Sequence, residues 1–110
     1  MVAGGGTDEM GGETEEDAVT EKELLQAVRD LARLRNWLVY HTHDSRRSEP
    51  GFPDLVLVKD RVLFVELKSE RGKPTPAQNE WHVALWQAGA TLFVWRPSDW
   101  LDGTIEKELM

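Results

Sequence analysis

The chain has 110 residues, contains no cysteine and carries a formal net charge of −7 at pH 7. This length suits one small domain, and the lack of cysteine excludes a disulfide framework and a thiolate metal site. No apolar run is long enough to span a bilayer and the N-terminus lacks the layout of a signal peptide, so we expect a soluble cytoplasmic protein.

The acidic residues are concentrated at the N-terminus. Residues 1–19 hold six acidic side chains, five glycines and no Lys or Arg, which leaves a net charge of only −1 on the rest of the chain. Such a segment cannot bury an apolar face, so we expect a disordered acidic tail. Between residues 29 and 47, five arginines outnumber two aspartates. This basic patch is compatible with phosphate contacts, and an alternative role for the tail is to occupy it and compete with DNA.

A helix is predicted from Thr20 to about Asn36. Thr20 and Glu23 form a capping box, in which each side chain accepts from the backbone amide of the other residue. Apolar residues then recur at the helical period and give the helix one buried face. They are Leu24, Leu25, Val28, Leu31 and Ala32. Glu21 shares this face, whereas Glu23 is occupied by the cap.

Residues 37–43 are rich in β-forming side chains, which predicts a first strand. The polar loop at 44–51 follows and contains Arg46 and Arg47. These two arginines are either solubilising surface residues or a basic clamp for a phosphate group.

Residues 54–68 are predicted to form a β-hairpin, because two apolar strands flank the polar turn Lys59-Asp60-Arg61. Asp54 opens the first strand. Glu66 and Lys68 leave one face of the second strand, because side chains alternate along a strand. The antiparallel return brings all three charged side chains to one end of the hairpin. Burying charges is costly unless they are paired or bind a metal ion, so this cluster favours a functional site.

A second helix is predicted from Thr75 to Ala88. Thr75 and Gln78 form another capping box, and Pro76 occupies the favoured first helical position. Gly89 is expected to end the helix in a left-handed conformation.

A near-continuous apolar strand at residues 91–96 is expected to be covered on both faces. Beyond it, Ser98 is expected to cap a short helix that Gly103 ends, and residues 104–110 to form a tail that is either a last helical turn or frayed. The order α-β-β-β-α-β predicts an α/β fold with a mixed sheet of about four strands flanked by helices. The crossover between the last two strands should be parallel and right-handed.

The arrangement of Pro53-Asp54, eleven intervening residues and Glu66-Leu67-Lys68 resembles the signature of the PD-(D/E)XK nuclease superfamily. Gly51-Phe52 before it and Gln78 in the next helix narrow the resemblance to the VRR-NUC domain of stand-alone phage and bacterial proteins. The similar region spans residues 20–97. The resemblance implies a restriction-endonuclease-like core, which agrees with the predicted order of elements.

The resemblance also implies a metal-dependent active site. Asp54, Glu66 and the backbone carbonyl of Leu67 are the implied ligands of Mg²⁺ or Mn²⁺, cations that prefer hard oxygen ligands. VRR-NUC domains carry a glutamate at the start of the first helix that completes the site. This role falls to Glu21, directly or through water, with Glu23 as the alternative. Glu21 would otherwise only interact with the helix dipole.

Two further residues complete the implied catalytic set. Lys68 would orient the attacking water or neutralise developing negative charge. Gln78 would hold Lys68 or a phosphate oxygen, although the capping box competes for the same side chain. Arg46, Arg47 and Lys73 are the expected contacts to nucleic acid.

The implied function is a metal-dependent DNA endonuclease that hydrolyses phosphodiesters and is structure-specific for branched DNA such as Holliday junctions. A junction has two-fold symmetry, so a homodimer with two active sites would match it. The alternatives are a flap or nicking nuclease, a catalytically silent nucleic-acid-binding module, and a structural partner subunit. The nuclease domain is expected to span residues 20–103, in a bacterial host or phage-infected cell, with no membrane partner.

Overall fold

The computed structural model describes residues 19–43 and 48–110. The expected acidic tail, apart from its last residue, and the loop arginines Arg46 and Arg47 lie outside these ranges. The elements in chain order are α2 (Glu21–Leu34), β2 (Leu38–His41), β3 (Leu55–Val58), β4 (Val62–Leu67), α3 (Pro76–Gln87), β5 (Thr91–Trp95), α4 (Pro97–Leu101) and α5 (Thr104–Glu108). The first six elements confirm the predicted order, and two short helices follow them.

The four strands form one mixed sheet in the order β2-β3-β4-β5. β2 pairs with β3 and β3 with β4 in antiparallel fashion, whereas β4 and β5 are parallel. The hairpin is in register with Val58 opposite Val62 and Leu55 opposite Val65. This register brings the residue before β3 beside the end of β4.

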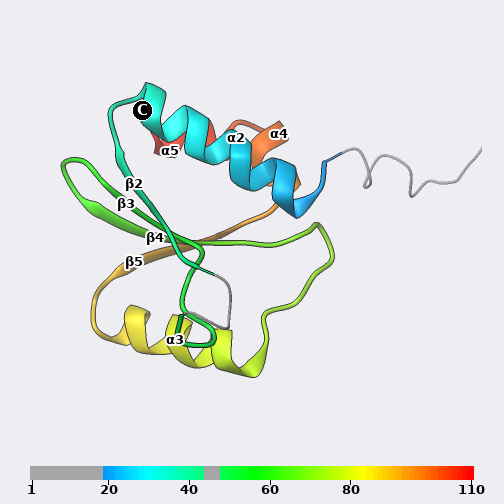
Figure 1. Cartoon of the computed structure of the whole chain (residues 1–110), viewed down its shortest axis with the longest axis vertical. Coiled ribbons are helices and arrows are strands. Elements are labelled where there is room, and N and C mark those ends of the chain that lie inside the picture. The colour runs from blue at the N-terminus through cyan, green and yellow to red at the C-terminus, as the bar shows by residue number, and fades with distance from the viewer. Residues whose placement is uncertain (1–18, 44–47) are drawn as a thin grey trace, which may run out of the picture.

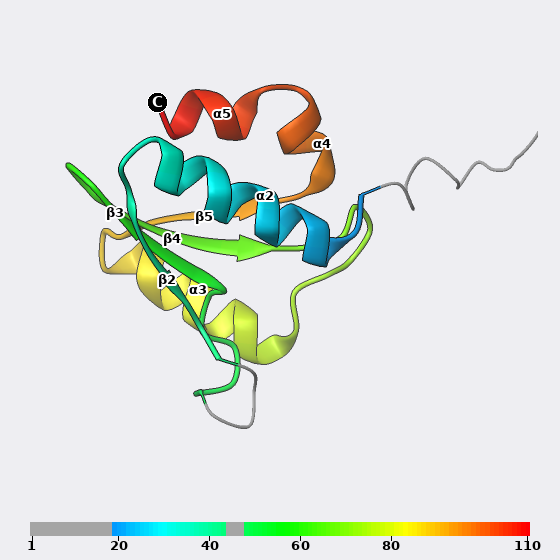
Figure 2. The same ribbon diagram turned by 45° about the horizontal axis from the view of Figure 1, so that its top comes forward.

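Helices cover both faces of this sheet. α2, α4 and α5 lie on one face and α3 lies on the other (Figure 1). The turned view shows α5 and α4 beyond α2 on the same side of the strands (Figure 2). The protein is therefore an α/β fold with a mixed four-stranded sheet between helical layers.

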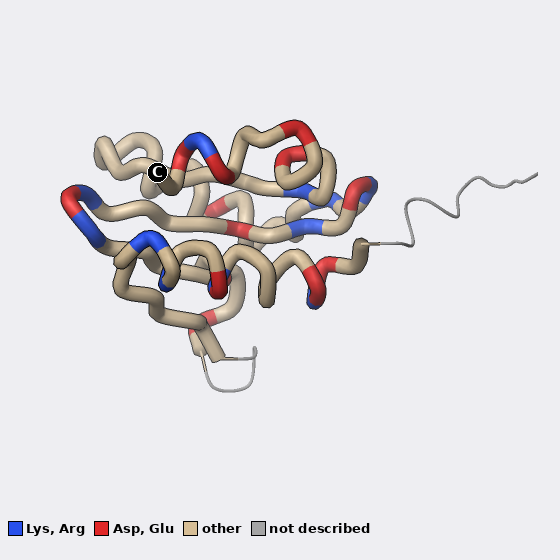
Figure 3. Tube along the Cα trace, turned by 90° about the horizontal axis from the view of Figure 1, so that it is seen from above, with Lys and Arg blue, Asp and Glu red and all other residues tan. Residues whose placement is uncertain are grey.

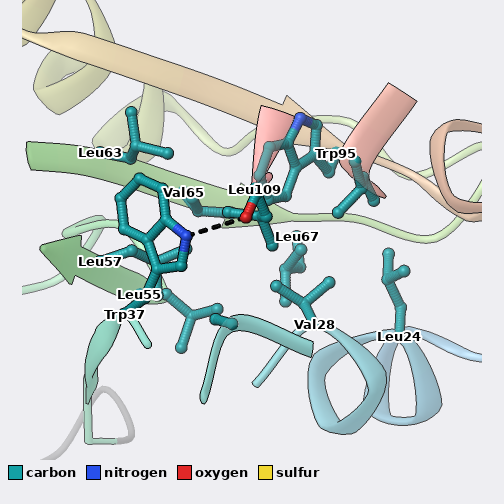
Figure 4. Packing of buried hydrophobic residues seen from close by; sticks show 12 residues of the cluster. Leu24, Val28, Trp37, Leu55, Leu57, Leu63, Val65, Leu67, Trp95 and Leu109 are labelled. Atoms are coloured by element: carbon teal, nitrogen blue, oxygen red, sulfur yellow. Dashed lines mark hydrogen bonds between the residues drawn. The ribbon is translucent and has the colours of Figure 1, made fainter. Parts of the chain in front are cut away.

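The main core lies between the sheet and α2. Alternate residues of β3 and β4 point toward this helix because side chains alternate along a strand. Twelve buried apolar residues make up the cluster, ten of which are labelled in Figure 4. They are Leu24, Val28, Ala32, Trp37, Leu55, Leu57, Leu63, Val65, Leu67, Trp95, Ile105 and Leu109.

The last helix contributes to the same core. Ile105 and Leu109 are fully buried, and the indole nitrogen of Trp37 donates a hydrogen bond of 3.1 Å to the carbonyl of Leu109 (Figure 4). Of the two forms expected for residues 104–110, the structure shows the helical one. The packed part of the chain thus extends to Leu109.

Both predicted capping boxes are present, at Thr20 with Glu23 and at Thr75 with Gln78. The predicted cap at Ser98 is wrong. α4 begins at Pro97 and its N-cap residue is Arg96, whose backbone amide donates to the carboxylate of Asp99 at 2.8 Å. Proline is favoured in the first helical turn, so the helix begins at Pro97, before the predicted cap residue.

Charged residues of both signs are interspersed along the described trace, rather than separated into an acidic and a basic side (Figure 3). Among the helices of residues 19–43 and 48–110, none has the length and apolar character needed to cross a bilayer.

Candidate active site

The two strands of the hairpin bring Asp54 to the end of β4. Asp54 precedes β3 and its Oδ2 accepts a hydrogen bond of 2.8 Å from the backbone amide of Leu67. Backbone pairing between neighbouring strands continues just beyond their ends. The amide of Thr42 donates to the carbonyl of Asp54 at 2.9 Å, and the amide of Lys68 donates to the carbonyl of Trp95 at 3.0 Å. Asp54 is therefore held between two strand ends, as the alternation of the hairpin predicts.

Glu66 is the most deeply placed charged residue of this group, with a relative exposure of 1%. Its Oε2 accepts a hydrogen bond of 2.9 Å from Nε2 of Gln78. The ammonium nitrogen of Lys68 lies 3.6 Å from the same oxygen. The structure thus brings together Asp54, Glu66, Lys68 and Gln78, four residues that the sequence assigns to one site.

Gln78 serves the helix cap and the site at the same time. Its Oε1 accepts from the backbone amide of Thr75 at 2.8 Å, while its Nε2 donates to Glu66 at 2.9 Å. The capping box and the contact to Glu66 do not compete, because the amide group has separate acceptor and donor ends.

His82 is a site neighbour that the sequence analysis did not single out. It has a relative exposure of 2% and is the buried residue of α3. Its Nε2 lies 3.8 Å from Oε1 of Glu66. Burial, followed by the charge of Lys68, lowers the pKa of His82 below its usual value, which favours the neutral imidazole. The sequence feature that could have identified His82 is its spacing of four residues from Gln78, which places both side chains on one face of the helix.

The surroundings of the two carboxyl groups disfavour their ionisation. Burial, together with the neighbouring charge of Asp54, raises the pKa of Glu66 to about 8. Burial also raises the pKa of Asp54 above its usual value, and the hydrogen bond from the Leu67 amide opposes that rise. At neutral pH and without a cation, Glu66 therefore retains a proton. Two adjacent, partly desolvated carboxylates with perturbed pKa values are typical of a functional site.

The start of α2 forms the rim of the site. A surface hollow of about 350 Å³ is lined by Glu21, Lys22, Leu25, Asp54 and Leu67. The charge of Glu21 also contributes to the raised pKa of Glu66. Glu23 instead bonds the backbone amide of Thr20 at 2.9 Å. Of the two alternatives, the structure places Glu21 beside the acidic pair and Glu23 in the cap.

Convergence of the acidic side chains is incomplete. Within the described parts of the chain, no group of three or more Asp, Glu or His side chains is placed to hold a metal ion by itself. Glu21 is exposed at the rim, whereas Asp54 and Glu66 lie deeper. Any bound cation would therefore need water or backbone oxygens in addition to the two deeper carboxylates.

The loop from β4 to α3 leaves the site directly after Lys68 and is held in place by Arg96. Nη1 of Arg96 donates to the carbonyls of Ser69 at 2.8 Å and Gly72 at 2.7 Å. Lys73 follows Gly72 and is exposed. The loop thus presents Lys73 to solvent next to the anchored segment.

The segment that precedes β3 packs closely against α3. Gly51 has a φ of +89°, and a Cβ there would lie 2.4 Å from the backbone carbonyl carbon of Ala77 in the first turn of α3. Phe52 packs edge-on against Phe64 and Trp81, with ring centroids 6.1 and 5.0 Å apart. The glycine therefore lets the segment before Asp54 pass next to α3, close to Gln78.

Comparison with known proteins agrees with this geometry. The VRR-NUC domain family matches residues 11–98, which is most of the chain. The chain belongs to the VRR-NUC family. A solved structure described as a VRR_NUC domain is 30% identical, with a TM-score of 0.63, and the match covers 80% of this chain and 97% of that one.

A second solved structure, described as a VRR_NUC domain protein, is 21% identical and also has a TM-score of 0.63. Its match covers 84% of this chain and 91% of that one, which shows the shared fold. No curated protein matches the chain. VRR-NUC is a nuclease-type domain family, so the cluster around Asp54 and Glu66 is the candidate active site of a nuclease-type protein.

Proposed function

We propose that the chain is a metal-dependent DNA endonuclease that hydrolyses phosphodiesters in branched DNA, such as Holliday junctions. The observation that supports it most is the pairing of Asp54 and Glu66 at one end of the hairpin, with Lys68 3.6 Å from Glu66. Two carboxylates and an ammonium group supply oxygen ligands and a positive charge beside them, which phosphodiester hydrolysis requires.

The residues fit Mg²⁺ or Mn²⁺. These cations take carboxylate and carbonyl oxygens and retain several waters, so two carboxylates suffice where three do not converge. Burial and the charge of Asp54 raise the pKa of Glu66 to about 8, and a bound cation would stabilise the ionised form. Asp54, Glu66 and the carbonyl of Leu67 would hold the ion, with Glu21 as a ligand at the rim or through water. A bound divalent ion lowers the pKa of its water and stabilises charge on a phosphate.

The remaining polar side chains would position the reacting groups and balance their charge. Lys68 would orient the attacking water or neutralise charge that develops on the phosphate. Gln78 fixes one oxygen of Glu66 from α3, and Lys73 on the exposed loop would contact the DNA backbone, as would Arg46 and Arg47. Each contact of this kind to a phosphate weakens as the salt concentration rises.

A second copy of the chain would match the symmetry of a junction. One sheet face offers a surface for it, because Leu38 lies opposite Val58 and Val58 opposite Val62 in the register. Their exposures are 73%, 36% and 46%. Neighbouring apolar residues exposed on one face are typical of an interaction surface. The Leu38→Lys variant is expected to be monomeric in sedimentation experiments in which the wild type sediments as a dimer.

The deciding experiment is cleavage of labelled four-way junction, flap, fork and linear duplex, each with Mg²⁺, Mn²⁺ or EDTA. Paired symmetric nicks in the junction, absent in EDTA and with Asp54→Ala, are expected. Cutting confined to flaps would retain the nuclease and overturn the junction preference. Binding of DNA without cleavage of any substrate would identify a binding module instead.

A further inference from the structure

The carboxylate of Glu66 faces α3 with both of its oxygens. Oε2 accepts from Gln78 at 2.9 Å, and Oε1 lies 3.8 Å from Nε2 of His82. Gln78 and His82 are four residues apart on α3, so they project from the same side of the helix toward β4. The helix therefore presents one polar side chain to each oxygen of the carboxylate.

Two polar atoms remain unsatisfied where His82 faces the carboxylate. Within the described residues, Oε1 of Glu66 and Nε2 of His82 are both buried and have no hydrogen-bond partner. Leaving a buried donor and acceptor unpaired is unfavourable, and buried polar groups are nearly always bonded. A shift of about 1 Å would shorten their separation to a hydrogen bond of about 2.9 Å.

His82 occupies a buried position of α3, where an apolar side chain is more usual. Its ring packs against Trp86, with centroids 5.8 Å apart, and the indole of Trp86 donates to the carbonyl of Leu92 at 3.2 Å. The imidazole is thus supported on the side of β5 and directed at Glu66.

We propose that His82 is a positioning residue, which donates a hydrogen bond from Nε2 to Oε1 of ionised Glu66 and, with Gln78, orients that carboxylate for a divalent cation beside Asp54. This inference rests on the proposed function, since it assumes that the cation binds. Hydrogen bonds to ligating carboxylates fix their orientation, and their loss weakens metal binding by about 10- to 100-fold. His82 itself does not contact the ion or the substrate.

The test is the affinity for Mn²⁺, measured by titration calorimetry on the full chain. His82→Phe removes the donor and is expected to weaken binding by about 10- to 100-fold. His82→Gln places an amide nitrogen near the position of Nε2 and is expected to recover most of the affinity. Gln87→Leu, at an exposed position of the same helix, serves as the matched control and should bind as the wild type does.

Folding of each variant is checked by circular dichroism. A second measurement uses the wild-type protein alone, so it is independent of whether the variants fold. In the Mg²⁺-loaded protein, ¹⁵N imidazole shifts should show His82 protonated on Nε2. Protonation on Nδ1 alone, or a folded His82→Phe with wild-type affinity, would overturn the inference while leaving the metal site intact. A wild-type protein that binds no Mn²⁺ would overturn the metal site, and the inference with it.

Discussion

The carboxylate of Asp54 accepts a hydrogen bond of 2.8 Å from the backbone amide of Leu67, so a side chain from one strand closes the end of the next. The same carboxylate faces Glu66 and raises its pKa. Asp54 therefore has two separable functions, a structural acceptor and a negative charge, and substitutions can remove one without the other.

Asp54→Asn retains an oxygen that can accept from Leu67 and removes the charge. In metal-free urea titrations, its free energy of unfolding is expected to be equal to or above that of the wild type, because the substitution removes a charge whose burial is unfavourable. It should bind no Mn²⁺ and cleave no DNA. Asp54→Ala loses the hydrogen bond too and should be less stable than Asp54→Asn by about 1–3 kcal/mol. Cleavage by Asp54→Asn at the wild-type rate would contradict its role as a ligand.

Lys68 is expected to act in the chemical step and not in metal binding. Its ammonium is a positive charge beside the cation site, so Lys68→Ala should bind Mn²⁺ at least as tightly as the wild type. Its kcat should fall by about 10²- to 10³-fold, as for the loss of one charge-stabilising group in other enzymes. Single-turnover cleavage and Mn²⁺ titration measure the two effects separately. Lys107→Ala, an exposed lysine of α5, is the matched control and should leave both unchanged.

Gln78 can be dissected through its capping partner. Thr75→Ala removes the N-cap hydroxyl that accepts from the backbone amide of Gln78 at 3.1 Å. The side-chain Nε2 of Gln78, which donates to Glu66, is retained. The substitution should lower the free energy of unfolding by about 1 kcal/mol with little change in Mn²⁺ affinity. Gln78→Ala should lose both stability and affinity. Equal effects of the two substitutions on affinity would show that Gln78 acts only through the helix.

The acidic pair predicts an inverted pH dependence of stability in the absence of metal. The pKa of Glu66 is raised from 4.5 to about 8, so between these values the folded protein binds more protons than the unfolded chain. The free energy of unfolding should therefore fall as the pH rises from 4.5 to 8. Urea titrations in EDTA across this range measure the slope.

Glu66→Gln removes the titrating group and is the control for that slope. Its stability should vary less between pH 5 and 8, where the wild type is expected to lose stability as Glu66 ionises. A wild-type slope that Glu66→Gln leaves unchanged would assign the effect to another group. Mn²⁺ affinity of the wild type should rise with pH over the same interval, because the ion competes with the proton.

The sequence was sufficient for the features that depend on local periodicity. Alternation along the hairpin predicts that Asp54, Glu66 and Lys68 meet at one end, and the capping boxes predict where α2 and α3 begin. The angle at which α3 crosses β4 is a tertiary property, and it decides that Gln78 can cap and reach Glu66 together. His82 lies in an apolar run, so its partnership with a strand residue became visible only in the folded chain.

Arg61 and Trp37 fasten the C-terminal helix to the sheet. The guanidinium of Arg61 donates to the side chain of Glu108 at 2.6 Å and to its carbonyl at 2.8 Å, and Trp37 bonds the carbonyl of Leu109. Leu109 is itself fully buried. A version of the protein ending at residue 98, where the family match stops, would therefore expose the core and tend to aggregate.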